Sequence, residues 1–406
     1  MKDLSASRLS FRDMDSLPAV VLAAGEGVRL RPLTRHRPKP MLPAANKPIL
    51  AYVFDGLIEA GVSDITVVVG YGRGRVQDHF GPTYRNVPLT YVRQQKQLGT
   101  GHALLAVEDR FDDEPFLVVY GDQILDSRIV RDVINDTAEE TAATIGVLDH
   151  NRVEHYGGVI MDGNQVTDLV ERPADERRYR LNAGIYGLRP RIFEAIRSAE
   201  PRDGEHSLID ALSWLVDETE VRGTITDGLW MDATYPWDLL EVMRDLTDAG
   251  VVGGTRDERI EDSATLHETV VIRDPVVIGP DVEVGPETVL GPYTCLGENV
   301  TVGSGAIIEG SVLDSDTRVG PNATLVDCVT GQGVHIGAAS TVPGGPGDVR
   351  IGDRVFERKR LGALLADRVD DHGATTFTPG TMVGSDTTVR AGTRVDGTIE
   401  EETEIR

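Results

Sequence analysis

The sequence predicts an α/β protein in two parts: a Rossmann-like domain on a mostly parallel sheet, followed by a parallel β-helix. Up to about residue 250, short apolar runs alternate with amphipathic stretches of helical period, as in a sheet covered by helices. Farther along, glycines recur every six residues, a period that neither a helix nor a simple hairpin array produces. The length of 406 residues also exceeds one ordinary domain and fits two.

Composition narrows the class of protein and its partners. The 66 acidic and 41 basic residues give a net charge of −25, which argues against nucleic acid and anionic membranes as partners. No apolar run approaches the roughly 18–20 residues of a membrane span, and Cys295 and Cys328 read as small buried residues of a reducing compartment, so we expect a cytoplasmic protein. Only five basic residues are lysines, an imbalance that indicates adaptation to high salt.

The first domain is expected over residues 17–250, after a flexible, polar tail at residues 1–16. Its strands read as apolar throughout because helices cover both faces of such a sheet. The predicted strands are AVVLAAG, ITVVVG, LTYVRQ, FLVVYGD and TAATIGVLD, and the clearest helix is KPILAYVFDGLIEAG. Ligands of these folds bind at the carboxyl ends of strands.

The second domain is expected over residues 265–400, after a linker at residues 251–264. Each repeat glycine follows an aliphatic residue, which predicts coils with three flat faces, an inward aliphatic side chain and a glycine that turns the corner. The pairs are Ile278–Gly279, Val284–Gly285, Leu290–Gly291, Leu296–Gly297 and Val302–Gly303. These segments resemble the hexapeptide repeats of left-handed parallel β-helices. Because flat faces of such solenoids pack side by side, we expect a homo-oligomer and favour a trimer.

A glycine-rich, basic segment follows the first predicted strand. Gly25 and Gly27 have no Cβ, so their backbone can approach phosphate oxygens, and Arg29 and Lys39 add positive charge. Leu30 stands where a dinucleotide fingerprint needs its third glycine, and no acidic residue closes a second strand about 20 residues later, which excludes hydride chemistry with such a cofactor. No Gly-Lys-Ser/Thr follows, so the segment is not a Walker loop.

The full run LAAGEGVRLRPLT…PKPML resembles the signature of sugar-1-phosphate nucleotidylyltransferases. The resemblance extends from about residue 18 to the end, because many members carry a hexapeptide-repeat tail. It implies a nucleotidyltransferase domain followed by a left-handed parallel β-helix. It further implies that backbone at Ala24, Gly25 and Gly27 wraps a triphosphate, with Arg29 and Lys39 as the catalytic cations.

A second segment, QQKQLGTGHAL, resembles the part of this family that reads the base. The resemblance implies that Gln94 pairs with the pyrimidine edge and that Gly99 and Thr100 complete nucleotide binding. The form is nearer to uridylyltransferases of N-acetylglucosamine 1-phosphate than to thymidylyltransferases, which favours UTP. Alternatively, Gln94 is a solvated strand end and Thr100 only caps a helix.

Metal and sugar sites are implied by the same resemblance. Asp122 ends FLVVYGD and Asp232 lies in LWMDATYPWDLL, and their family counterparts bind Mg²⁺, which prefers carboxylate, phosphate and water oxygens. The segments HYGGVIMD, DLVERPAD and LNAGIYGL supply the expected contacts to the sugar phosphate, namely Gly157, Glu171, Arg172 and Asn182.

The expected reaction is attack of a sugar 1-phosphate on the α-phosphorus of UTP, giving UDP-glucose or UDP-N-acetylglucosamine and pyrophosphate. Charge neutralisation and positioning suffice, because the nucleophile is already anionic. The substrates are small molecules, a nucleoside triphosphate and a sugar 1-phosphate. The alternatives are a thymidylyltransferase, an enzyme with a second acetyl-CoA-dependent activity using His335 or His372, and a non-catalytic sugar-nucleotide sensor.

Overall fold

A computed structural model describes residues 17–137, 141–150, 153, 156–171, 173–175, 177–202 and 204–406; the expected tail at residues 1–16 lies outside them. The chain divides into two compact units, and each unit takes up two segments of the chain. The first unit holds the described residues up to Gly25 together with Leu50–Met231. The second unit holds Glu26–Ile49 and Asp232–Arg406.

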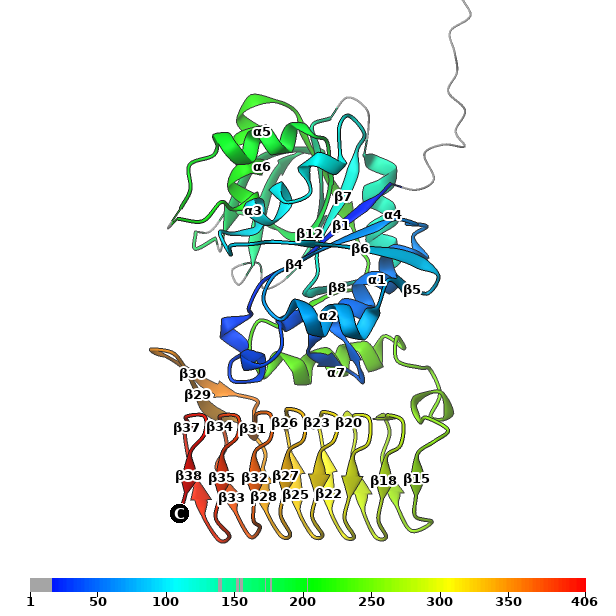
Figure 1. The fold of residues 1–406 in the computed structure, drawn as a ribbon, viewed down its shortest axis with the longest axis vertical. Coiled ribbons are helices and arrows are strands. Elements are labelled where there is room, and N and C mark those ends of the chain that lie inside the picture. The colour runs from blue at the N-terminus through cyan, green and yellow to red at the C-terminus, as the bar shows by residue number, and fades with distance from the viewer. Residues whose placement is uncertain are drawn as a thin grey trace, which may run out of the picture. The chain divides into compact units, whose positions relative to one another are not determined.

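The first unit is built on a ten-stranded sheet with the order β10-β11-β13-β9-β12-β7-β1-β4-β6-β5 (Figure 1). The strand pairings make seven of the ten strands run in one direction, with β5, β11 and β12 opposed, so the expected mostly parallel sheet is confirmed. The five predicted strands correspond to β1, β4, β6, β7 and β9. The bounds are β1 Ala19–Ala23, β4 Ile65–Val69, β5 Thr83–Tyr84, β6 Val87–Arg93, β7 Phe116–Tyr120, β9 Ala143–Leu148, β10 Gly157–Asp162, β11 Gln165–Glu171, β12 Arg180–Leu188 and β13 Val221–Thr226, with the short strands β8 Gln123–Leu125 and β14 Trp230–Asp232 outside this sheet.

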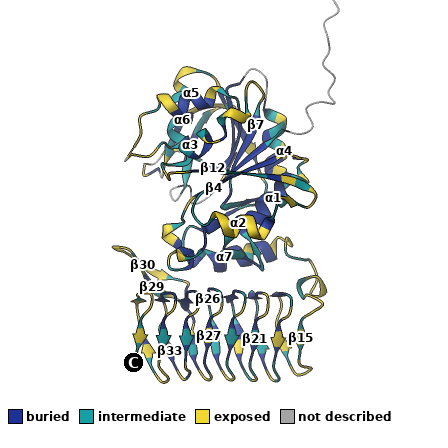
Figure 2. Ribbon diagram, viewed as in Figure 1, coloured by how far each residue is buried: buried dark blue, intermediate teal, exposed yellow. Residues whose placement is uncertain are grey.

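Helices cover the sheet and explain why its central strands are apolar throughout. Side chains of α3, α5 and α6 form one core with alternate residues of the strands, among them Val20, Leu22, Phe116 and Val118. Helix α4 packs against β9, β12 and β13. Every residue of β1 and β4 is therefore buried (Figure 2). The helices are α1 Ile49–Glu59, α2 Arg73–Phe80, α3 Thr100–Leu105, α4 Ser127–Asp136, α5 Arg191–Ser198 and α6 Leu208–Glu218.

The second unit combines the basic segment with the C-terminal half of the chain. Its N-terminal part consists of short elements, namely the 3-10 turns η1 Val28–Leu30, η2 Leu33–Arg35 and η3 Lys39–Met41 and the paired strands β2 Pro43–Ala44 and β3 Lys47–Pro48. Helix α7 spans Asp238–Asp248 and precedes the solenoid. Among the helices of the described residues, none has the length and apolar character needed to cross a membrane.

The solenoid is a β-helix whose coils contribute to three parallel sheets of eight, seven and seven strands (Figure 1). This is the arrangement expected of a left-handed β-helix. The five aliphatic residues predicted to point inward are all buried. The first sheet contains β15 Thr265–Leu266, β18 Glu283–Val284, β21 Thr301–Val302, β24 Arg318–Val319, β27 His335–Ile336, β32 Asp370–Asp371, β35 Thr388–Val389 and β38 Glu404–Ile405. The second contains β16 Val271–Ile272, β19 Val289–Leu290, β22 Ile307–Glu309, β25 Thr324–Val326, β28 Thr341–Pro343, β33 Thr376–Phe377 and β36 Arg394–Val395. The third contains β17 Val276–Ile278, β20 Thr294–Leu296, β23 Val312–Leu313, β26 Cys328–Thr330, β31 Ala363–Leu365, β34 Thr381–Val383 and β37 Thr398–Ile399.

The repeat glycines have a different purpose from the predicted one. The left-handed backbone at the corners belongs to residues two positions later, Asp281, Glu287, Tyr293, Asn299 and Gly305, and not to the repeat glycines. An ideal Cβ on Gly285 would lie 2.9 Å from the backbone nitrogen of Ser304 in the next coil. The glycines are therefore required because adjacent coils approach closely at these points.

The six-residue period of the glycines lapses after Gly303, for two structural reasons. Neighbouring coils are first offset by 17 residues instead of 18, as in the pairs Thr301–Arg318 and Arg318–His335. A hairpin of β29 (Gly347–Ile351) and β30 (Arg354–Lys359) is then inserted between β28 and β31.

Both cysteines are free and buried, as predicted. Burial raises the pKa of the Cys328 thiol to about 12, and it raises the pKa of the Cys295 thiol as well.

Candidate active site

Four neighbouring strands of the first unit end at one edge of the sheet and bring three predicted nucleotide and metal residues there. Strands β6, β4, β1 and β7 are adjacent and parallel, so their carboxyl ends meet. Gly25 follows β1, Gln94 follows β6 directly, and Asp122 comes two residues after β7. This edge is where a Rossmann-like sheet binds its ligands.

After β1, the backbone at Ala24 is packed against neighbouring residues, whereas the backbone at Gly25 is open to solvent. An ideal Cβ on Gly70 would lie 2.8 Å from the carbonyl oxygen of Ala24, and Gln97 Nε2 donates to that oxygen at 3.1 Å. Gly25 is exposed and has no atom within 4 Å of an ideal Cβ. Gly25 can therefore contact a ligand. Gly70, which the sequence reasoning missed, packs against Ala24, the residue before Gly25.

The side chain of Gln94 is fixed by two neighbours. Its Nε2 donates to the carbonyl oxygen of Gly99 at 3.1 Å and lies 3.2 Å from His102 Nδ1. Because a carbonyl only accepts, the amide nitrogen of Gln94 must face Gly99. Gln94 Oε1 takes part in neither bond, so the amide can present an acceptor. With 6 % exposure, Gln94 is not the solvated strand end considered as the alternative.

Gly99 and Thr100 begin helix α3 and connect it to α6. Gly99 has φ 93°, and an ideal Cβ there would lie 2.5 Å from the carbonyl oxygen of His206, so only glycine fits. Thr100 Oγ1 accepts from the backbone N–H of Leu208 at 2.9 Å. The N-cap of α3 is Gly99, so the alternative in which Thr100 only caps this helix is wrong.

Three of the predicted sugar contacts lie together in the first unit. Gly157 and Glu171 are register partners across β10 and β11, and an ideal Cβ on Gly157 would lie 3.4 Å from Asn182 Cβ. Asn182 is buried, and its Oδ1 accepts from the N–H of Gly184 at 3.1 Å. Glu171 is exposed. The fourth predicted contact, Arg172, lies outside the described residues.

Tyr120, the last residue of β7, lies between the predicted metal residue Asp122 and the predicted sugar contacts. The sequence reasoning missed it. Its ring meets that of Tyr186 edge-on, with the ring centroids 5.8 Å apart. Burial raises the pKa of Tyr120 to about 12, and the charges of Asp122 and Glu171 act in the same direction. Tyr120 therefore stays protonated between the predicted metal and sugar residues. The only signal in the sequence was its place at a strand end.

In the second unit, the basic segment folds so that Gly27 lies against Lys39. Gly27 has φ 70°, and an ideal Cβ there would lie 2.7 Å from Lys39 Cβ. Thr34 Oγ1 donates to the carbonyl oxygen of Gly27 at 2.8 Å. The spacing Gly-x-Gly thus serves two purposes, since Gly25 is open to ligand and Gly27 permits the close approach of the lysine.

Most cations of this segment are already paired within the second unit. Lys39 is 8 % exposed, and its Nζ lies 2.5 Å from Asp232 Oδ1, while Thr234 Oγ1 donates to the other oxygen of Asp232. Other charged contacts of the segment are Arg31–Glu26, Arg35–Glu401, His36–Asp386 and Arg37 with Asp314 and Asp367. Arg29 is exposed and takes part in none of the ion pairs found among the described residues. From the sequence, the whole basic segment was expected to offer positive charge to phosphates. In the described part of the chain, Arg29 is the one cation of this segment that has no ion-pair partner.

Carboxylates suited to a hard cation are present at both predicted positions. Asp122 is partly accessible, whereas the side chain of Asp232 is only 5% exposed. Within the described ranges, no group of three or more His, Cys, Asp or Glu side chains is arranged to hold a metal ion. Asp122 and Asp232 are each a carboxylate of the kind that Mg²⁺ binds together with phosphate and water oxygens.

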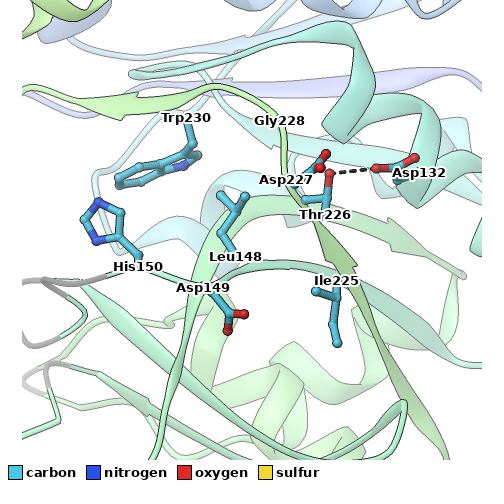
Figure 3. Close-up of a pocket in the computed structure, with 9 residues that line it drawn as sticks. All are labelled: Asp132, Leu148, Asp149, His150, Ile225, Thr226, Asp227, Gly228 and Trp230. Carbon is cyan, nitrogen blue, oxygen red and sulfur yellow. Dashed lines mark hydrogen bonds between the residues drawn. The ribbon is translucent and has the colours of Figure 1, made fainter.

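A cavity of about 660 Å³ opens at the carboxyl ends of β9 and β13 (Figure 3). Its lining comprises Asp132, Leu148, Asp149, His150, Ile225, Thr226, Asp227, Gly228 and Trp230. Among the described residues of the lining there are three carboxylates and no arginine or lysine, a composition unsuited to a triphosphate. None of the predicted site residues lines it, although Trp230 Nε1 donates to the carbonyl oxygen of Ala183 at 3.0 Å, next to Asn182.

Both histidines considered for acetyl transfer are exposed on the β-helix. His335 Nδ1 lies 2.9 Å from Asp370 Oδ1, and His372 Nε2 lies 3.4 Å from Asp370 Oδ2. They are coil-surface residues that share one carboxylate.

Comparisons with known proteins match both halves of the chain. The model of the family described as nucleotidyl transferase matches residues 18–249, and that of the GMPPB C-terminal domain matches residues 272–399. "Bifunctional protein GlmU" of Methanocaldococcus jannaschii is 34% identical over 95% of this chain and 97% of its own length. "UTP--glucose-1-phosphate uridylyltransferase AglF" of Haloferax volcanii is 36% identical over 55% of this chain and 93% of its own. The solved structure of a UDP-glucose pyrophosphorylase complexed with UDP-glucose matches 58% of this chain and 99% of its own with a TM-score of 0.53 at 24% identity, a likeness of fold.

Proposed function

Because the chain belongs to the nucleotidyl transferase family, we propose that it transfers a uridylyl group from UTP to a sugar 1-phosphate. The observation that carries this proposal is the grouping of Gly25, Gln94 and Asp122 at one sheet edge. The cluster of Gly157, Glu171 and Asn182 in the same unit supports it. The printed name of the Haloferax relative, which states UTP and glucose 1-phosphate, favours the same substrates.

Each predicted residue then has a defined task. Backbone N–H groups from Ala24 to Gly27 bind the triphosphate, and the exposed guanidinium of Arg29 adds positive charge beside them. Lys39 contacts the phosphates, Gln94 accepts a hydrogen bond from the base, and Gly99 and Thr100 shape the base pocket. Arg29 and Lys39 are the catalytic cations, because they stabilise charge on the reacting phosphate.

The chemical step is an in-line displacement. A phosphate oxygen of the sugar 1-phosphate forms a bond to the α-phosphorus, and the bond from that phosphorus to the β-phosphate oxygen breaks with its electron pair leaving on pyrophosphate. No proton has to be removed from the nucleophile, so no general base is needed. The chain's task is to align the two anions and offset their repulsion.

Nucleotidyltransferases of this family use a divalent metal, and we assign Mg²⁺ here with Asp122 and Asp232 as its protein ligands. When bound, it would neutralise charge on the phosphate oxygens. Lys39 and Thr234 hold the carboxylate of Asp232 from both sides, so its orientation is fixed by the chain itself.

The sugar is bound by Gly157, Glu171, Arg172 and Asn182. The exposed carboxylate of Glu171 is suited to accept hydrogen bonds from ring hydroxyls, and Gly157 lets the ring approach backbone. The product is UDP-glucose or UDP-N-acetylglucosamine. We place the reaction in the cytoplasm, which the two free, buried cysteines fit.

A pyrophosphate-release panel tests the proposal. The purified chain is mixed with each of UTP, dTTP, CTP and GTP and with several sugar 1-phosphates, in molar salt with Mg²⁺. We expect release with UTP and glucose 1-phosphate or N-acetylglucosamine 1-phosphate. Release with dTTP in preference to UTP would make the protein a thymidylyltransferase, and no release with any pair would contradict the proposal.

A second activity is favoured by one observation, the likeness over nearly the whole chain to a relative named as bifunctional. Acetyl transfer by the β-helix would release coenzyme A from acetyl-CoA in the presence of glucosamine 1-phosphate. A thiol probe measures it, and His335→Ala and His372→Ala show whether either histidine takes part.

We propose that the β-helix also assembles the protein, as a trimer. Val271 and Ile307 are exposed by 50% and 39% on the second sheet, and Val289 lies between them in register. An apolar row on a flat face favours contact with another copy. Light scattering after gel filtration in molar salt measures the mass, and a monomer at micromolar concentration would contradict this assembly.

A further inference from the structure

The basic segment is attached to the β-helix by a row of ion pairs inside the second unit. Arg37 Nη1 lies 2.5 Å from Asp314 Oδ2, and its Nη2 lies 3.3 Å from Asp367 Oδ1. His36 Nε2 lies 3.8 Å from an oxygen of Asp386. Arg35 Nη2 lies 2.8 Å from Glu401 Oε1. Three consecutive residues thus each meet a carboxylate of the solenoid.

These carboxylates come from successive coils. Asp314, Asp367, Asp386 and Glu401 follow strands β23, β31, β34 and β37, which belong to the third sheet in that order, with β26 between the first two. At the opposite end of the segment, Cys295 Sγ of β20 lies 2.7 Å from Asn46 Oδ1. The segment therefore runs along the stack of coils, antiparallel to the order in which the chain builds them.

Arg37 is the central anchor of this row. Its side chain is 3% exposed, whereas those of Arg35 and His36 are 47% and 35% exposed and their pairs are weakened by water. Burial alone would lower the pKa of Arg37, but Asp314 and Asp367 more than offset it, so the pKa is raised and the guanidinium stays charged.

The two buried carboxylates are themselves fixed by the coils. The N–H of Ser315 donates to Asp314 Oδ1 at 2.7 Å, and the N–H of Gln332 donates to Asp367 Oδ1 at 2.9 Å. Arg37 thus meets acceptors held by solenoid backbone. A planar guanidinium can bridge two such carboxylates, which a lysine ammonium cannot do with the same geometry.

The link from Arg37 to the catalytic lysine is short and stiff. Pro38 follows Arg37, Lys39 comes next, and Pro40 follows it in η3. Each proline fixes its own φ, and each restricts the residue before it. The position of Arg37 therefore restrains where the backbone of Lys39 lies.

We propose that Arg37 is a positioning residue for nucleotidyl transfer, through which the β-helix holds Lys39 in its working place. The inference rests on the proposed function, because Lys39 matters only if it contacts phosphates. It makes the solenoid a required part of the transferase, in addition to any part it has in assembly. Arg37 itself touches no substrate.

The test is a double-mutant cycle of Arg37→Gln and Lys39→Ala, read as steady-state pyrophosphate release. We expect Arg37→Gln to lower kcat about 10-fold or more with a KM for UTP within about 3-fold of wild type, and Arg37→Lys to recover part of the loss. In the Lys39→Ala background, Arg37→Gln should have almost no further effect. A purely structural role would instead lower the active fraction equally in both backgrounds, and equal losses would overturn the proposal.

Two controls keep the outcomes separate. Arg390→Gln removes the same charge from a pair with Glu404 on the outermost coils and should change kcat less than about 2-fold. If Arg37→Gln does not fold, Asp367→Asn replaces it in the cycle with the same expected pattern. An inactive wild type would contradict the proposed function, whereas an active wild type with a normal kcat in these variants would overturn only the role of Arg37.

Discussion

The ammonium group of Lys39 lies 2.5 Å from Asp232 Oδ1, although 193 residues separate the two in the sequence. Their side chains are only 10% and 5% exposed. One was predicted to contact phosphates and the other to bind a metal, so the second unit brings a predicted catalytic cation and a predicted metal ligand into direct contact. The lysine is therefore held in place before any substrate arrives, and it orients the carboxylate.

Replacing the lysine is expected to remove most of the activity. Lys39→Ala deletes one electrostatic stabiliser of the reacting phosphate and leaves Asp232 without its cation, so turnover should fall about 10²-fold or more. Steady-state pyrophosphate release measures it, with circular dichroism to verify folding. A folded variant with near-normal turnover would remove Lys39 from the catalytic groups.

Removal of the second proposed metal ligand should produce a different pattern. Asp122→Asn keeps the shape of the side chain but weakens the binding of a divalent cation, so turnover should fall about 10²-fold and more Mg²⁺ should be needed to reach half of the remaining rate. Titration of Mg²⁺ at saturating UTP measures both. An unchanged Mg²⁺ dependence would show that Asp122 is not a ligand.

The contact between Gln94 and His102 predicts how the base is selected. With its nitrogen bonded to Gly99, the amide offers Oε1 to the N3–H of uracil, whereas N3 of cytosine is an acceptor. Gln94→Ala should lower the ratio of kcat/KM for UTP over CTP about 10-fold or more, and His102→Phe should lower it by less.

Gln95→Ala provides the matched control, because Gln95 is an exposed neighbour of the same residue type. It should leave the UTP to CTP ratio unchanged. A wild-type ratio in Gln94→Ala would contradict base reading by this residue.

A partly buried carboxyl near the proposed metal ligand, that of Asp238, predicts a pH dependence of stability. Burial raises the pKa of Asp238 to about 7, with Asp232 and Glu241 adding to the rise and backbone N–H bonds from Tyr235 and Thr234 opposing it. In the unfolded chain its pKa is about 3.9. Between these values the folded protein holds a proton that the unfolded chain has lost, so the contribution of Asp238 to stability is present at pH 4 and is lost as the pH rises through 7.

The variant Asp238→Asn should lose this dependence. Asn can still accept from the N–H groups of Thr234 and Tyr235, so its free energy of unfolding relative to wild type should rise between pH 4 and pH 7 and then stay level. Denaturant titrations at several pH values in constant salt measure it, with the exposed Asp257→Asn as control. A constant difference from wild type over this range would contradict the raised pKa.

The sequence was sufficient to predict features that depend on local pattern. Strands β1, β4, β7 and β9 were visible because both faces of the sheet are covered there, and the β-helix was visible because each coil repeats the same inward position. The reason for the repeat glycines was not predictable, because the close approach of the next coil is a property of the stack.

Features that depend on distant residues could not be predicted. Arg37 read as one more cation of a phosphate loop, because nothing local shows that its partners are Asp314 and Asp367, more than 250 residues away. Tyr120 was missed because its importance lies in its surroundings, namely the ring of Tyr186 and the charges of Asp122 and Glu171. The hairpin at β29 and β30 appeared only as a lapse in the period.

The transfer of the α-phosphorus tests the central claim most directly. The chain is incubated with UTP labelled at the α-phosphate, Mg²⁺ and glucose 1-phosphate or N-acetylglucosamine 1-phosphate, and the products are separated by anion exchange. The account predicts that the label moves into a UDP-sugar in equal amount to the pyrophosphate released. Label that remains in UTP or appears only in UMP, with either sugar phosphate present, would contradict it.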